Sequence, residues 1–136
     1  MIQPAGTTNL LFSQDIPSPC YVCEEARLKE NLTLMQHVQN QSGASIILAL
    51  KGFAMWSTFD LVKHYLQGCT ASSVWEARLA REEMNQQVHA YAPAYKAQDI
   101  DELVGLVDHI SFNSISQWQR FAEQVSKAGL STGLRV

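Results

Sequence analysis

The sequence lacks the features that mark membrane-spanning, secreted and nucleic-acid-binding proteins. No apolar run reaches the roughly 18 to 20 residues that cross a bilayer, and Met1–Thr8 shows neither the basic start nor the apolar core of a secretory signal. The 3 cysteines are too few for a disulfide framework. The 10 Lys and Arg residues are outnumbered by 13 Asp and Glu and form no cluster. We therefore predict a cytoplasmic protein with free thiols and with no nucleic-acid or membrane partner.

The composition is that of an ordinary globular protein. Hydrophobic residues make up 46% of the 136 residues and charged residues 17%, which suits about one domain with a real core. Residues 1–19 are polar and end in the pair Pro17 and Pro19, which favours an extended arm. We assign residues 1–19 to this arm and residues 20–136 to the folded part.

A helix is predicted directly after the arm. From Glu24 onward, apolar residues recur at spacings of four, three and three, at Leu28, Leu32, Met35 and Val38. The pair Ser42–Gly43 then supplies a stop signal. The helix is expected to present one apolar face.

After Gly43 a strand–helix unit recurs about every 20 residues. The strand candidates are residues 45–51, 69–72, 88–92, 109–113 and 132–136. Helices are predicted to start at 57–60, 73–76 and 114–117, the last two with capping-box patterns, and the last helix carries a stripe of Trp118, Phe121, Ala122 and Val125 before Gly129. The pattern predicts an α/β fold with parallel strands, either an open doubly wound sheet or a closed barrel. Periodicity does not choose between them.

Lys51 is the sharpest chemical signal. It closes the apolar run that begins at Ser45, and Gly52 follows it. In an α/β barrel, active sites form at this end of the strands. A lysine that loses hydration there becomes a better nucleophile or imine former. The alternative is a strand-terminal lysine whose ammonium group reaches into water.

The segment around Lys51 resembles the lysine segment of carboxynorspermidine (carboxyspermidine) decarboxylases, which are pyridoxal-phosphate enzymes. The resemblance is carried by residues 49–56, Ala-Leu-Lys-Gly-Phe-Ala-Met-Trp. Further stretches agree in order and spacing, from about Pro19 to the end of the sequence: residues 19–22, 70–73, 76–79, 89–96, 112–114, 117–118 and 133–136. The resemblance implies a partial (β/α)8 TIM barrel of the alanine-racemase-like class, with about five βα units present and the C-terminal β-domain absent. It also implies that Lys51 is the catalytic lysine that binds pyridoxal phosphate.

The resemblance implies further cofactor-binding residues. Arg135 would line the cofactor pocket from the fifth strand, and the alternative is an arginine in a salt bridge at the barrel rim. Thr70 stands about where ornithine-type decarboxylases carry an acidic residue, so this part of the pocket must be built differently. Thr70 and Ser72 are candidates to face the cofactor, or are ordinary strand-end hydroxyls. His89 shares a strand face with Tyr91, and points into the barrel or packs as a hydrogen-bonded core residue.

Two other patterns predict no site. Glu76 is best explained as the capping acid of its helix. Cys20 and Cys23 match a dithiol spacing but have no second pair for zinc, and His37, His64 and His109 show no partner spacing. We therefore expect no metal.

The implied activity is decarboxylation of carboxynorspermidine or carboxyspermidine to norspermidine or spermidine and CO2, by a homodimer in polyamine biosynthesis. The sequence ends inside a predicted strand, residues 133–136, and five units are fewer than the eight of a closed barrel. We expect these residues to be part of a longer enzyme and to be inactive alone. Two alternatives stay open: an alanine-racemase-like or cofactor-carrier barrel, and a truncated remnant without catalytic activity.

Overall fold

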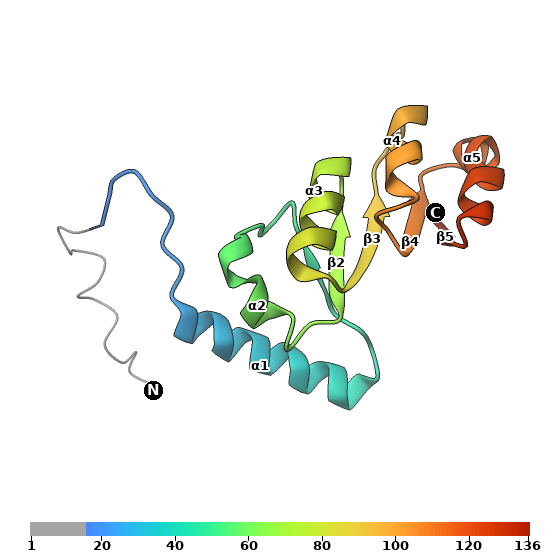
Figure 1. Ribbon diagram of the computed structural model, residues 1–136. Helices are drawn as coiled ribbons and strands as arrows, with labels where there is room; N and C mark the ends of the chain where they lie inside the picture. The colour runs from blue at the N-terminus through green and yellow to red at the C-terminus, as the bar shows by residue number, and fades with distance from the viewer. Residues whose placement is uncertain (1–15) are drawn as a thin grey trace.

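The computed structural model describes residues 16–136, so most of the predicted arm, residues 1–15, lies outside the described residues. Helices and strands alternate along the chain after the first helix (Figure 1). The helices are α1 (Glu25–Ser42), α2 (Phe59–Val62), α3 (Val74–Leu79), α4 (Ala97–Leu103) and α5 (Ile115–Lys127), with the short turns η2 (Trp56–Thr58) and η3 (Ala80–Met84). The strands are β1 (Ile47–Ala49), β2 (Gly68–Ala71), β3 (Gln87–Tyr91), β4 (His109–Phe112) and β5 (Ser131–Leu134). All five predicted strands are therefore confirmed, with ends that differ by at most two residues.

The five strands form one parallel sheet in the order β1-β2-β3-β4-β5. Each strand pairs with the next one along the chain, so the order never reverses. A doubly wound sheet reverses at a switch point and carries helices on both faces, whereas successive neighbours are the arrangement of a (β/α) barrel. The strand order therefore favours the barrel over the open doubly wound sheet, which periodicity could not distinguish.

Burial separates the two faces of the sheet. Residues of one face are buried beneath the helices: Cys69, Ala71, Val88, Ala90, Ile110 and Phe112. The alternate residues, among them Thr70, His89, Tyr91 and Ser111, are only half-buried. We call this second face the inner face, because it corresponds to the interior of a barrel. Among residues 16–136, no helix covers it to the same extent.

The first helix has the predicted bounds, but only part of its apolar face is buried. It ends at Gly43, whose φ of 72° is the left-handed conformation that glycine adopts readily. Leu32 is buried, whereas Met35 and Val38 are 40% and 46% exposed. The apolar face is therefore buried at Leu32 but not at Met35 and Val38, and a polar side chain joins the C-terminal part of α1 to the sheet.

That side chain is Gln39, which is 7% exposed. Its Oε1 accepts a hydrogen bond from the backbone N–H of Ile46 at 2.8 Å, and its Nε2 donates to the carbonyl of Tyr65 at 2.7 Å. The amide thus joins α1 to the start of β1 and to the chain that enters β2. Both halves of the buried amide are satisfied, which is why a polar residue is tolerated there.

The two predicted capping boxes form, but their glutamate and glutamine side chains bond the residue before the N-cap. Ser73 and Ser114 accept hydrogen bonds from the backbone N–H groups of Glu76 and Gln117, each at 3.2 Å. The Glu76 carboxylate reaches back to the N–H of Ser72 rather than to the N-cap itself. The helix predicted to start at 57–60 is short: α2 ends at Val62. It has no side-chain cap, because the Thr58 hydroxyl donates to the Met55 carbonyl.

We predict that Gly68→Ala destabilises the sheet. A Cβ at position 68 would overlap the carbonyl oxygen of Gln87 and lie 2.9 Å from its carbonyl carbon, so β2 and β3 would have to separate. Overpacking of this kind costs about 1 to 3 kcal/mol. Chemical denaturation followed by circular dichroism measures the loss. Gly105→Ala is the control, because its Cβ would meet only ordinary van der Waals contact. Equal stability of the two variants would contradict this prediction.

None of the helices within residues 16–136 is long and apolar enough to span a membrane.

Candidate active site

Lys51 lies in a tight turn directly beyond β1. The backbone N–H groups of Gly52 and Phe53 both donate to the carbonyl of Ala49, at 2.9 and 3.1 Å. The N–H of Leu50 donates to the backbone carbonyl of Thr70. These bonds fix the turn at the carboxyl end of the strand, where the sequence predicted it. Within residues 16–136, the Lys51 amine has neither a hydrogen bond nor an ion pair, so it is free to react with a ligand.

One expectation about Lys51 is wrong: its side chain is exposed rather than withdrawn from water. The reason is topological. β1 is the outermost strand of the sheet and pairs with β2 alone among the described strands. The amine therefore faces solvent at this edge.

An apolar cavity of about 460 Å³ lies beside the Lys51 turn. Residues 52–55 form one wall, and the segment that precedes α1 forms the other with Tyr21, Val22 and Cys23. Cys20 and Cys23 are free thiols in this segment. The lining is mostly apolar, so the cavity suits a hydrocarbon portion of a ligand rather than a charged group.

Arg135 directly follows β5 and is held in place by Tyr91. Its backbone N–H donates to the carbonyl of Phe112 at 2.9 Å, which extends the β4–β5 ladder by one residue. Its Nη1 donates to the Tyr91 hydroxyl at 2.5 Å, and the guanidinium carbon lies 5.2 Å from the centre of the Tyr91 ring. Among residues 16–136, Arg135 forms no ion pair with a carboxylate. The partner of the Arg135 side chain is thus the Tyr91 phenol, and the alternative of a salt bridge at the barrel rim is not seen in the described part of the chain.

The middle of the inner face holds a pair of histidines. His89 lies in register with Thr70 on one side and with His109 on the other, and the two imidazole rings are 5.2 Å apart. The His109 nitrogens approach the hydroxyls of Ser131 at 3.0 Å and Ser111 at 3.1 Å. Burial lowers the pKa of His109, and the nearby His89 lowers it further, so the neutral form of this imidazole is favoured. The sequence showed no partner spacing for His109, and the structure places it beside His89 because the two residues lie in register on neighbouring strands.

Thr70 and Ser72 have different surroundings. Thr70 is half-buried in β2, on the same face as His89. Ser72 is exposed, and both its N–H and its hydroxyl donate to the Glu76 carboxylate, at 2.6 and 2.9 Å. The geometry favours Thr70 as the residue free to face a ligand, and ties Ser72 to the start of α3.

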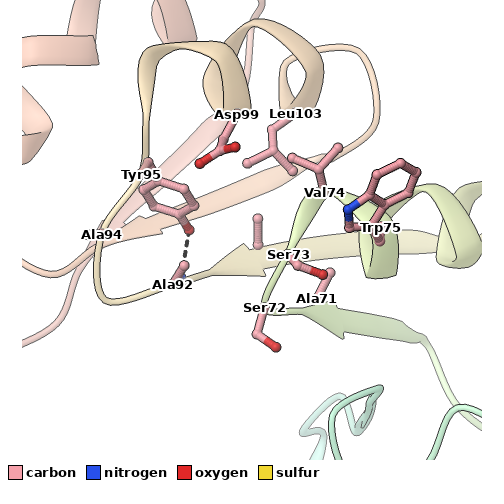
Figure 2. Close-up of a pocket in the computed structure, with 11 residues that line it drawn as sticks. Ala71, Ser72, Ser73, Val74, Trp75, Ala92, Ala94, Tyr95, Asp99 and Leu103 are labelled. Carbon is pink, nitrogen blue, oxygen red and sulfur yellow. Dashed lines mark hydrogen bonds between the residues drawn. The ribbon is translucent and has the colours of Figure 1, made fainter.

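A second pocket, of about 260 Å³, lies between the starts of α3 and α4, on the helix side of the sheet (Figure 2). Its hydroxyl and carboxylate groups are engaged in local structure. The Tyr95 hydroxyl accepts from the N–H of Ala92 at 2.9 Å and donates to the Ser111 carbonyl at 3.2 Å, and Asp99 accepts from the N–H of Lys96. Burial raises the pKa of Tyr95 to about 12, so the phenol stays protonated. This pocket therefore offers few groups for chemistry.

The structure brings some of the candidate residues together and leaves others apart. Arg135 joins Tyr91, and His89 lies beside Thr70 and His109, whereas Lys51 and Arg135 follow the two outermost strands of the sheet. The inner-face positions of the five strands carry amide, hydroxyl and imidazole groups but no carboxylate, and Arg135 adds a guanidinium directly after β5. This donor set suits an anionic ligand. Among residues 16–136, no group of three or more His, Cys, Asp or Glu side chains could hold a metal ion.

Comparison with known proteins identifies relatives along most of the chain. No family model matches the sequence. The carboxyaminopropylagmatine decarboxylase of Synechocystis sp. is 43% identical over 121 residues, which are 89% of this chain and 31% of the relative. The carboxynorspermidine/carboxyspermidine decarboxylases of Campylobacter jejuni and Herminiimonas arsenicoxydans are 42% and 44% identical, over 92% and 89% of this chain and 32% and 33% of their own lengths.

A solved structure agrees with these relatives. The crystal structure of carboxynorspermidine decarboxylase from Campylobacter jejuni, complexed with norspermidine, matches with a TM-score of 0.82 at 42% identity, over 86% of this chain and 31% of that one. The chain thus spans about a third of the length of its relatives. The five parallel strands and their helices correspond to part of a decarboxylase fold, in agreement with a partial barrel. The chain is homologous to carboxynorspermidine/carboxyspermidine decarboxylases over the third of their length that it spans.

Proposed function

We propose that this chain is the lysine-bearing part of a pyridoxal-phosphate-dependent decarboxylase that acts on carboxynorspermidine or carboxyspermidine. The observation that carries the proposal is Lys51, which lies in a turn at the carboxyl end of β1 and has no partner for its amine within residues 16–136. That edge of a parallel α/β sheet is where active sites are built. Norspermidine or spermidine and CO2 would be the products.

The residues present fit this cofactor. The Lys51 amine would attach it covalently, and the guanidinium of Arg135 would donate to one of its oxygens or to a substrate carboxylate. The absence of carboxylates from the inner-face strand positions favours a ligand that carries negative charge. When bound, pyridoxal phosphate supplies an electron sink for the electron pair left by departing CO2. Thr70 would contribute a neutral hydroxyl, and His89 an imidazole, from the floor of the site.

Residues 20–136 would then be part of the cofactor-binding barrel, with residues 1–19 as an arm that precedes it. The proposal includes a homodimer, which the resemblance implies, and a cytoplasmic location. Sequencing beyond Val136 tests this organisation. A downstream β-domain with a glycine-rich phosphate loop supports the decarboxylase, and an immediate stop codon supports the remnant without activity.

Substrate choice provides the direct test of function. We predict that a full-length enzyme carrying this segment turns over carboxynorspermidine or carboxyspermidine with a kcat/KM about a hundredfold or more above that for ornithine, lysine or diaminopimelate. Release of CO2 with each substrate measures this. Carboxyaminopropylagmatine belongs in the assay, because a relative named for that substrate is 43% identical. Preference for a plain amino acid would overturn the polyamine assignment.

A further inference from the structure

Three neighbouring strands each contribute one polar side chain to a network at the carboxyl edge of the sheet. Tyr91 ends β3, Asn113 follows β4 and Arg135 follows β5. The Tyr91 hydroxyl accepts from Arg135 Nη1 at 2.5 Å and donates to Asn113 Oδ1 at 3.0 Å. A phenol has one proton to donate, so the bond to Asn113 leaves an oxygen lone pair for the guanidinium. The direction of both hydrogen bonds is therefore determined.

The guanidinium is held in a second way. Its carbon lies 5.2 Å from the centre of the Tyr91 ring, within the range of a cation–π contact. One N–H thus points to the hydroxyl, while the aromatic face limits where the rest of the group can lie. The backbone beneath is also fixed, because Arg135 N–H bonds the Phe112 carbonyl and Asn113 N–H bonds Gln117 Oε1 at 3.3 Å.

The network leaves the charge of Arg135 available. Within the described part of the chain no carboxylate neutralises it, and only one of its side-chain N–H groups donates a hydrogen bond. An arginine that is already ordered loses less conformational entropy when an anion binds. The hydrogen bond and the ring contact therefore order the Arg135 side chain before an anionic group binds.

We propose that Tyr91 is a positioning residue that orients Arg135 toward an anionic group, phosphate or carboxylate, and that Asn113 fixes the Tyr91 hydroxyl. The proposal rests on the proposed function, in which the phosphate belongs to the cofactor and the carboxylate to the substrate. It adds two residues, Tyr91 and Asn113, to the site. Both act through Arg135 and need not touch the ligand.

The test uses Tyr91→Phe and Asn113→Ala in a full-length enzyme carrying this segment. Tyr91→Phe keeps the ring and removes the hydroxyl. It should weaken binding of the anion about tenfold without changing the thermal unfolding midpoint. A raised dissociation constant for pyridoxal phosphate identifies the cofactor phosphate as the anion, whereas a raised KM with unchanged cofactor affinity identifies the substrate carboxylate. Asn113→Ala should act in the same direction and more weakly.

A double-mutant cycle separates positioning from general destabilisation. In an Arg135→Lys background, Tyr91→Phe should have almost no further effect, since the oriented group is already absent. Tyr65→Phe is the matched control, because the Tyr65 hydroxyl makes no hydrogen bond within residues 16–136, and this variant should match the wild type. Wild-type binding by Tyr91→Phe, or full additivity with Arg135→Lys, would overturn the proposal.

A spectroscopic measurement keeps the two proposals distinguishable. In the wild type, the Tyr91 ring should shift the NMR signals of the Arg135 side chain, and Tyr91→Leu should remove this shift. If the shift is present but the full-length protein binds no pyridoxal phosphate, the proposed function fails and the positioning contact stands. If the protein is active but the shift is absent in the wild type, the positioning role fails alone.

Discussion

Replacing Lys51 by alanine is expected to abolish covalent attachment of pyridoxal phosphate to a full-length enzyme that carries this segment, and to lower kcat by more than about a thousandfold. The physical reason is that the primary amine at the end of β1 would be the group that bonds the cofactor and yields it to the substrate amine. Treatment with borohydride, followed by peptide mass spectrometry, measures the attachment. The wild type should carry the cofactor on the peptide that contains Lys51.

Lys63→Ala is the matched control for this experiment. The Lys63 amine is already engaged with the Asp60 carboxylate at 2.5 Å, on a different element of the fold. This variant should retain both the attached cofactor and the activity. Cofactor that remains reducible onto another lysine in Lys51→Ala would overturn the assignment of Lys51.

Phe112→Ala is expected to lower the free energy of unfolding by about 3 to 5 kcal/mol, the largest stability effect that we predict. Phe112 is fully buried in β4, where its ring meets the edge of Tyr95 at 5.8 Å and stacks with Phe121 at 6.5 Å. Truncation would leave a cavity between the sheet, α5 and the turn before α4. Urea denaturation followed by circular dichroism provides the measurement.

Leu134→Ala provides the comparison for Phe112→Ala. Leu134 lies in register with Phe112 on the neighbouring strand but is 45% exposed. Its truncation should cost about 1 kcal/mol or less, because most surface truncations lie near zero. Similar losses for the two variants would show that Phe112 does not anchor the core.

The strands and helix starts could be predicted from sequence because their causes are local. All five strands were found, and Ser73 and Ser114 cap α3 and α5 through a residue three positions further on. The last helix also follows its pattern, with Phe121 and Val125 buried. Such signals need only the spacing of neighbouring residues along the chain.

The predictions of side-chain burial fail where contacts between distant parts of the chain determine it. Met35 and Val38 continue the apolar spacing of α1 but are exposed, and Gln39 anchors the helix through groups up to 26 residues away. Lys51 is exposed because its strand is outermost among those described. Local spacing carries no information about which elements lie on the other side of a residue.

The sequence by itself determined the alternation of strands and helices, the position of Lys51 at a strand end and, through a resemblance that the comparisons confirm, the decarboxylase family to which the chain is related. Only the tertiary structure decided that the strands follow one another in order across the sheet, and that Tyr91 and Arg135, 44 residues apart, share a hydrogen bond. Strand order and register arise from backbone pairing between segments far apart in the chain, which spacing within each segment does not encode.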